Sequence, residues 1–132
     1  MIKSTIVIPN YNGIKYIQAC LESLYGGTAK EFEVIVVDNA STDGSMELVR
    51  DRFPGVRLIV NRENTGFSHA VNQGIRASTT PYVILLNNDT QAELSFVHEL
   101  EKVMDSDRDK KVFSASARMI SLYDKDKTDD AG

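Results

Sequence analysis

The chain has 132 residues, a net charge of −4, and 42% apolar and 26% charged residues, values typical of one globular domain with a hydrophobic core. The acidic balance argues against a nucleic-acid partner, because duplex binding needs a basic face. A single cysteine, Cys20, excludes an internal disulfide. The apolar start is too short for a signal peptide, and no run approaches the ~18 apolar residues of a membrane span. We therefore expect a cytoplasmic protein.

Short β-branched or apolar runs predict strands at residues 5–8, 33–38, 57–61, 82–86 and 111–115. Apolar residues at helical spacing predict helices between them, around residues 14–24, 46–53, 67–75 and 94–104. Ser45 is expected to cap the second helix, and Thr90 with Glu93 to form a capping box for the fourth. The alternation predicts an α/β fold, a mostly parallel sheet with helices on both faces. Residues 1–120 form this domain, and the charged, aperiodic residues 121–132 a loop or tail.

Polar clusters follow each of the first four predicted strands, at residues 9–12, 38–45, 61–66 and 87–89. The last of them, Asn87-Asn88-Asp89, comes directly after an apolar run that reads as a strand buried on both faces. Polar groups at the mouth of a buried strand are costly unless they bind something or satisfy a turn. Since ligands of parallel sheets bind outside the carboxyl ends of the strands, the clusters predict one site at this edge.

Several common kinds of site are excluded by the motifs. The first strand is not followed by a G-x-G-x-x-G turn, and the chain has no Walker A sequence. A receiver domain would need paired carboxylates after the first strand, where Asn10-Tyr11-Asn12 stands. No Ser or Cys occupies a G-x-S-x-G elbow, which argues against a nucleophilic triad.

The remaining residue types suit a nucleotide. Tyr11 could stack on a planar base. Asp38 could accept a hydrogen bond from a ring N–H, which favours a pyrimidine. Asp89 is a hard oxygen ligand for Mg²⁺ or Mn²⁺, although one carboxylate with amides would need a diphosphate to complete the metal's shell.

Four segments resemble the family 2 glycosyltransferases of GT-A fold: residues 4–12 (STIVIPNYN), 36–45 (VVDNASTDGS), 64–67 (NTGF) with Ala70, Asn72 and Gly74, and 85–89 (LLNND). They stand in the family's order and spacing across nearly the whole chain. The sequence looks closest to bacterial enzymes that build surface polysaccharides, including rhamnosyltransferases. The resemblance implies the Rossmann-like, nucleotide-binding half of the GT-A fold.

The resemblance also implies a role for individual residues. Pro9 and Tyr11 would form the wall of the base pocket, and Asp38 would read the base edge. Asn64 and Gly66 would lie along the nucleotide. The family's D-x-D-type motif falls on Asn87-Asn88-Asp89. Within it, Asp89 would hold the divalent cation and Asn87 would contact the ribose, with Asn88 between them in the substrate site.

The implied reaction is inverting transfer of a sugar from a UDP- or dTDP-sugar to a saccharide or lipid-linked saccharide, the latter at the inner face of the membrane. The family's acceptor-binding half and catalytic base follow the region that corresponds to residues 114–120. Because the sequence ends at Gly132, we expect the donor-binding portion, without a catalytic residue. The alternative is a catalytically silent nucleotide-binding or assembly module. Surface uncovered by a missing half would favour self-association.

Each site residue also has a purely structural interpretation. Asp38 could cap the turn after its strand, and Asn87 and Asn88 could be turn formers. Tyr11 could be a tyrosine at the edge of the core. Asn64 and Gly66 could serve only to let the chain turn tightly.

Overall fold

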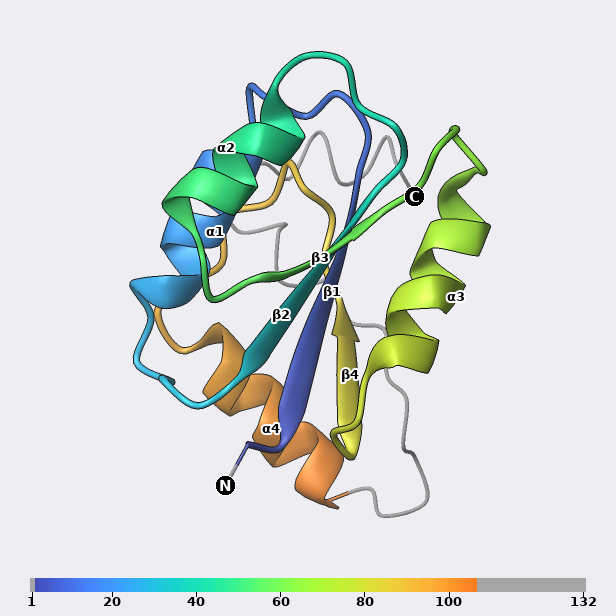
Figure 1. The fold of residues 1–132 in the computed structure, drawn as a ribbon. Helices are drawn as coiled ribbons and strands as arrows, with labels where there is room; N and C mark the ends of the chain where they lie inside the picture. Colours follow the sequence, from blue (N-terminus) through green and yellow to red (C-terminus); the bar gives the residue numbers. More distant parts are fainter. Residues whose placement is uncertain (1, 107–132) are drawn as a thin grey trace, which may run out of the picture.

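The predicted strands form one parallel sheet in the computed structural model, which describes residues 2–106. Its strands are β1 (Ser4–Asn10), β2 (Glu33–Asp38), β3 (Arg57–Val60) and β4 (Tyr82–Leu85). They lie in the order β3-β2-β1-β4, with β1 paired to both β2 and β4 (Figure 1). The parallel α/β prediction is therefore confirmed for this part of the chain. The strand expected at 111–115 and the tail at 121–132 lie outside the described residues.

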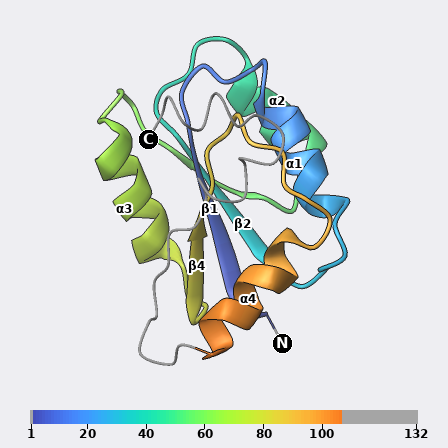
Figure 2. The same cartoon turned by 180° about the vertical axis from the view of Figure 1, so that it is seen from behind.

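Four helices connect and follow these strands within residues 2–106: α1 (Ile17–Tyr25), α2 (Ser45–Arg52), α3 (Phe67–Ala77) and α4 (Phe96–Ser106). Helix α3 covers one face of the sheet, and α1, α2 and α4 cover the other (Figures 1 and 2). The arrangement leaves the carboxyl ends of all the strands, and the loops that follow them, at one edge.

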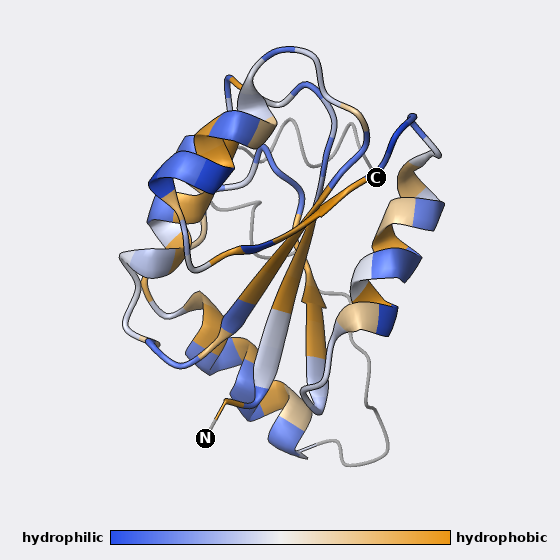
Figure 3. Ribbon diagram, in the orientation of Figure 1, coloured by the Kyte–Doolittle hydropathy of each residue, from blue (hydrophilic) through white to orange (hydrophobic). Residues whose placement is uncertain are grey.

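The core follows from the two-residue period of the strands. Ile6, Ile8 and Val36 belong to the cluster that includes Leu21 of α1 and Leu100 of α4. Their neighbours in the strands point to the other face, where a smaller cluster packs against α3; its buried members are Val7, Ile35, Val37, Ala70 and Val83. Figure 3 shows β2 and β4 mostly orange and the loop from β2 to α2 mostly blue and white. Burial on both faces explains why the strands read as continuous apolar runs.

The capping box predicted at Thr90 and Glu93 is wrong, because α4 begins only at Phe96. The segment before it is held by distant groups instead. The Ala92 N–H donates to Ser23 Oγ at 2.8 Å, and the Leu94 carbonyl accepts from the Thr28 N–H at 2.7 Å. These tertiary hydrogen bonds hold the segment outside the helix, which therefore starts later than its local pattern indicates.

The N-cap predicted at Ser45 is also wrong. The cap of α2 is Gly44, in the left-handed conformation with φ of 90°, and Ser45 is the first helical residue. The Ser45 N–H donates to Asp43 Oδ1 at 3.0 Å, while its hydroxyl accepts from Asn10 at 3.0 Å. The hydroxyl that would cap the helix is thus used to join α2 to the end of β1.

No helix within residues 2–106 combines the length and the apolar character needed to cross a bilayer.

Candidate functional site

An open cleft of about 350 Å³ lies at the carboxyl edge of the sheet. Every loop that follows a strand contributes to it. The residues that line it are Pro9, Asn10, Tyr11, Asn39, Asn64, Phe67, Asn87, Asn88 and Asp89. Most residues predicted to bind substrate or metal therefore come together in one place, and the two exceptions are Asp38 and Gly66.

Three residues of the lining were not predicted: Asn10, Asn39 and Phe67. Asn10 and Asn39 stand beside predicted residues in the strand-end clusters, and the sequence does not tell which residues of each cluster face the cleft. Phe67 is 57% exposed, although it belongs to the apolar pattern that predicted the helix around residues 67–75. An exposed aromatic residue beside a polar cleft is a candidate binding surface.

Asp38 is fully buried and outside the lining. Its Oδ1 accepts from the Ser41 hydroxyl at 2.8 Å and from Asn10 Nδ2 at 2.9 Å, and its Oδ2 accepts from the Ser41 N–H at 2.9 Å. The carboxylate thus holds the turn after β2, which is its structural interpretation. The next residue, Asn39, follows the end of β2 and lines the cleft.

Asn39 organises a second set of hydrogen bonds along the cleft. Its Oδ1 accepts from Asn61 Nδ2 at 2.8 Å and from the Thr65 hydroxyl at 3.1 Å, and its Nδ2 donates to the Gly66 carbonyl at 3.1 Å. Gly66 has a φ of 92°, which a residue with a side chain rarely adopts. Asn64 Oδ1 accepts from the Gly66 N–H at 2.9 Å, so Gly66 shapes the loop on which Asn64 reaches the cleft.

The Asn87-Asn88-Asp89 segment lies over the buried thiol of Cys20, whose Sγ donates to the Asn87 carbonyl at 3.7 Å. Burial raises the pKa of the Cys20 thiol to about 12, and the charge of Asp89 adds to the effect. Thr90, directly after Asp89, is fully buried, and its hydroxyl has no hydrogen-bond partner in the described part of the chain.

The donor atoms of the cleft suit a hard cation that shares its ligands with a phosphate. Among residues 2–106, no three His, Cys, Asp or Glu side chains come together as a metal site. Asp89 is the carboxylate of the cleft lining, beside the amides of Asn87 and Asn88. Mg²⁺ and Mn²⁺ prefer such oxygen ligands and are commonly held by one or two carboxylates plus substrate phosphates.

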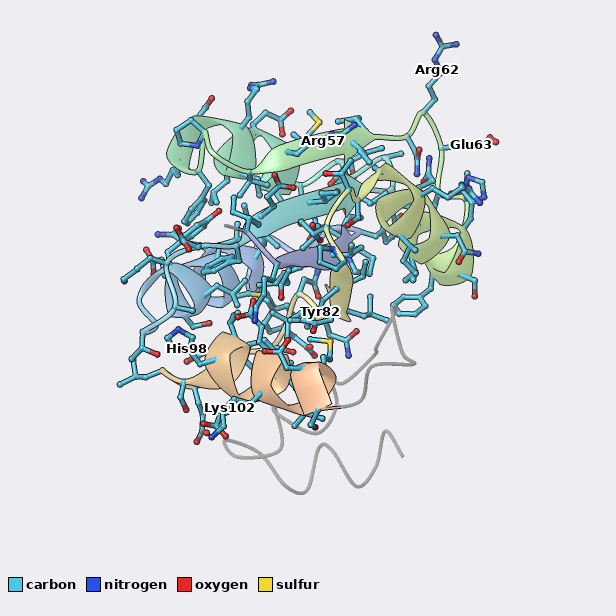
Figure 4. All side chains as sticks on the ribbon, turned by 90° about the horizontal axis from the view of Figure 1, so that it is seen from below. Arg57, Arg62, Glu63, Tyr82, His98 and Lys102 are labelled. Carbon is cyan, nitrogen blue, oxygen red and sulfur yellow. The ribbon has the colours of Figure 1, made fainter. Side chains whose placement is uncertain are left out.

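The ionisable residues His98 and Lys102 lie on α4, outside the cleft lining. His98 and Lys102 project from α4 toward solvent (Figure 4). His98 Nδ1 lies 3.0 Å from the Thr28 hydroxyl. His98 is an exposed residue.

Comparisons with known proteins agree on one family. The protein-family model described as glycosyl transferase family 2 matches residues 5–124 of this chain. The chain is 35% identical over 112 residues to the teichoic acid poly(glycerol phosphate) polymerase of Staphylococcus epidermidis, covering 81% of this chain and 16% of that protein. It is 33% identical over 102 residues to the glycosyltransferase GlyA of Streptococcus pneumoniae, covering 76% of this chain and 15% of that protein.

Solved structures show the same fold. Residues 1–349 of the Staphylococcus aureus protein TarS, in complex with UDP, superpose with a TM-score of 0.72 at 25% identity, covering 79% of this chain and 32% of that one. Its complex with UDP-GlcNAc gives a TM-score of 0.70 at 27% identity, covering 79% and 31%. The mannosyltransferase PcManGT of Pyrobaculum calidifontis, with GDP-Man and Mn²⁺, gives 0.60 at 31% identity, covering 68% and 28%. The chain thus spans about a third or less of the proteins it resembles here.

Proposed function

Because the chain belongs to glycosyl transferase family 2, we propose that it binds a nucleotide-diphosphate sugar in the cleft at the carboxyl edge of the sheet. The protein that carries this domain would transfer the sugar, with inversion, to a saccharide or lipid-linked saccharide. The names of its relatives support a role in bacterial surface polymers, since one is a teichoic acid polymerase.

The observation that carries the proposal is the composition of the cleft. Pro9 and the half-exposed ring of Tyr11 offer an apolar surface for a base, and Asp89 with Asn87 offers oxygen atoms for a cation and a ribose. A cleft that combines an aromatic ring with a single carboxylate fits a base joined to a diphosphate. Asn64 and Asn88 add hydrogen-bonding groups between these two parts.

Asp89 is the residue that would hold a divalent cation, Mg²⁺ or Mn²⁺. Bound together with the diphosphate, such an ion stabilises the negative charge that develops on the leaving group. Since the cleft supplies one carboxylate, the metal and the nucleotide should bind more tightly together than either does alone. The Mn²⁺ in the PcManGT complex supports the choice of ion.

We favour a pyrimidine base, UDP or dTDP, because TarS was solved with UDP and with UDP-GlcNAc. PcManGT was solved with GDP-Man, so GDP is the informative competitor. Asp38 lies buried outside the cleft lining, and Asn39, the residue after β2, lines it. The predicted contact between Asp38 and the base is tested by a preference for UDP or dTDP over GDP.

Isothermal titration of the 132-residue chain with UDP, dTDP and GDP, each with and without Mn²⁺, tests the proposal. We expect tighter binding of UDP or dTDP when Mn²⁺ is present, and loss of this gain in Asp89→Ala. The matched control is Asp105→Ala, which removes an exposed carboxylate at the end of α4, away from the cleft. A folded chain that binds no nucleotide would contradict the proposal.

A thermal-shift panel gives an independent readout of the same binding. A ligand present at about 100 times its dissociation constant adds about 2.7 kcal/mol to the free energy of unfolding. The Tm of the wild-type chain should therefore rise with UDP and Mn²⁺ together and rise less with either alone.

A further inference from the structure

Asn10, the last residue of β1, uses both ends of its buried amide. It is 2% exposed. Its Nδ2 donates to Asp38 Oδ1 at 2.9 Å, to Ser45 Oγ at 3.0 Å and, more weakly, to Ser41 Oγ at 3.4 Å. Its Oδ1 accepts from Asn88 Nδ2 at 2.8 Å. One side chain thus joins the ends of β1 and β2, the start of α2 and the loop after β4.

The partners of Asn10 fix which end of its amide, and of the Asn88 amide, faces which neighbour. Asp38 accepts hydrogen bonds from the Ser41 N–H, the Ser41 hydroxyl and Asn10 Nδ2, so the nitrogen end of the Asn10 amide faces it. The oxygen of the Asn10 amide then faces Asn88, whose nitrogen is the only amide atom that can donate a hydrogen bond to it. The oxygen of the Asn88 amide is therefore on the branch turned away from Asn10. A carboxylate in the core sets the orientation of two amides in succession.

We propose that Asn10 is a positioning residue that, held by Asp38, orients Asn88 and with it the adjoining Asp89 for the metal–diphosphate. The inference rests on the proposed function. Asn88 lies 78 positions from Asn10 in the sequence. Its hydrogen bond therefore ties the loop after β4 to the end of β1, the neighbouring strand of the sheet. Because Asp89 follows Asn88 directly, fixing the amide restrains the carboxylate. Asp38 acts through this chain of hydrogen bonds.

Gly13 supports the inference independently. A Cβ atom built on Gly13 would overlap both Asn10 Oδ1 and Asn88 Nδ2, the two atoms of the hydrogen bond. The positive-φ glycines of the described chain are Gly44 and Gly66, so Gly13 has an ordinary backbone. The absence of its side chain, and not its conformational freedom, is what this site requires. Glycine at position 13 leaves the space that the hydrogen bond between Asn10 and Asn88 occupies.

The test compares nucleotide binding with and without metal. Isothermal titration of the 132-residue chain gives the dissociation constant of UDP in the absence and in the presence of Mn²⁺, and their ratio is the gain due to metal. We expect Asn10→Ala to lower this ratio roughly fivefold to tenfold, the effect of one buried hydrogen bond. The affinity for UDP alone should fall by a smaller factor than this ratio, because the contacts of Pro9 and Tyr11 with the base and of Asn87 with the ribose remain.

Two further variants separate positioning from general damage. Gly13→Ala forces Asn10 and Asn88 apart without altering either side chain, and should lower the ratio in the same way. Ser45→Ala removes another partner of Asn10 but leaves the path from Asp38 to Asn88 intact, so its ratio should stay at the wild-type value. The electron paramagnetic resonance spectrum of bound Mn²⁺ should change in Asn10→Ala and in Gly13→Ala, and should not change in Ser45→Ala.

The outcomes are distinct. A wild-type ratio in folded Asn10→Ala or folded Gly13→Ala overturns the inference while leaving the proposed function in place. An equal loss in Ser45→Ala also overturns it, because the effect would then be a general loosening of the loops. Absence of any Mn²⁺-dependent gain in the wild-type chain overturns the proposed function, and the inference with it. If Asn10→Ala does not fold, Gly13→Ala decides.

Discussion

At the carboxyl edge of the sheet a group of polar side chains is buried, whereas an ion pair at the amino edge lies in solvent. Asn10, Asp38 and Asn39 are each at most 4% exposed. At the opposite edge, Lys3 and Asp105 form an ion pair of 2.8 Å with side chains 40% and 47% exposed. Figure 4, viewed from below, shows Tyr82 of the same edge near α4.

The two edges differ in how much hydration their polar groups lose on folding. A buried polar group must recover its lost hydration through hydrogen bonds, and the carboxyl edge does so with two connected sets, around Asn10 and around Asn39. An exposed ion pair loses little hydration and contributes little. Buried amides that a hydrophobic core does not need are therefore evidence for a binding site, and the exposed pair is not.

The largest effect is expected at Asp38. Asp38→Ala leaves the buried donors of Asn10 and Ser41 without their acceptor, which should lower the free energy of unfolding by about 3 kcal/mol. Urea denaturation measures the change. The control is Glu33→Ala, at the exposed first position of the same strand, which should leave the midpoint nearly unchanged. Equal effects at both positions would erase the distinction between buried and exposed polar groups on β2.

The next effect concerns binding. Tyr11→Ala removes the half-exposed ring from the cleft and should weaken UDP binding about tenfold, because stacking of a base on an aromatic ring is worth roughly 1–3 kcal/mol. Stability should change little, since the ring is 52% exposed. Tyr16→Ala is the control: its ring is 47% exposed but outside the cleft lining. Titration calorimetry of both variants checks this, and equal affinities would remove Tyr11 from the site.

The order of strands and helices could be predicted because it depends on local periodicity. The position of the site followed as well, since parallel strands bring their carboxyl ends to one edge. The inward turn of Asp38 could not be predicted, because it depends on register: Asp38 pairs with Asn10 across the sheet. Asn10 and Asp38 are far apart in the sequence, and nothing in the sequence shows that these two residues are paired across the strands.

The start of α4 shows a second limit of sequence reasoning. Thr90 and Glu93 have the spacing of a capping box, and an isolated peptide could begin a helix there. In the folded chain, Ser23 and Thr28 bind the backbone of residues 92 and 94 instead. Tertiary hydrogen bonds override a local preference worth about 1 kcal/mol. The hydroxyl of Thr90 is left buried without a described partner.

The Cys20 thiol predicts a pH effect confined to alkaline solution. Burial, with the charge of Asp89, raises the pKa of Cys20 from 9.0 to about 12. Between these values the thiol ionises in the unfolded chain and stays protonated in the folded one. The free energy of unfolding should therefore fall as the pH rises through this range, by up to about 1.4 kcal/mol per pH unit.

Other groups titrate in the same range, so the informative quantity is a difference. The stability of Cys20→Ala relative to wild type, from urea denaturation at each pH, should be constant below about pH 8.5 and then improve. A constant difference throughout would show that the thiol beneath the Asn87-Asn88-Asp89 segment is not shielded from ionising.

Thr90 predicts a gain in stability. Thr90→Val replaces the unpartnered hydroxyl by a methyl group of similar size, which should raise the free energy of unfolding by about 1 kcal/mol. The matched control is Thr5→Val, where the buried hydroxyl lies 2.7 Å from the Thr80 hydroxyl and the same substitution should be destabilising. Loss of stability in Thr90→Val would mean that its hydroxyl is satisfied after all, by a bound water or by the site.

The smallest effect is expected at the amino edge, in Asp105→Asn. Hydrogen bonds from Lys3 and then Tyr82 hold the pKa of Asp105 below its ordinary value of 3.8. A lowered pKa means that the ionised carboxylate stabilises the folded chain at neutral pH, and that this stabilisation is lost as the pH falls below 3.8. Because the pair is exposed, solvent screening should keep the difference from wild type near the error of a urea titration at pH 7. The remaining difference should shrink in 1 M salt and vanish in acid. A large effect at Asp105 that salt does not reduce would make the two edges of the sheet alike, and burial would no longer distinguish the polar groups that bind from those that do not.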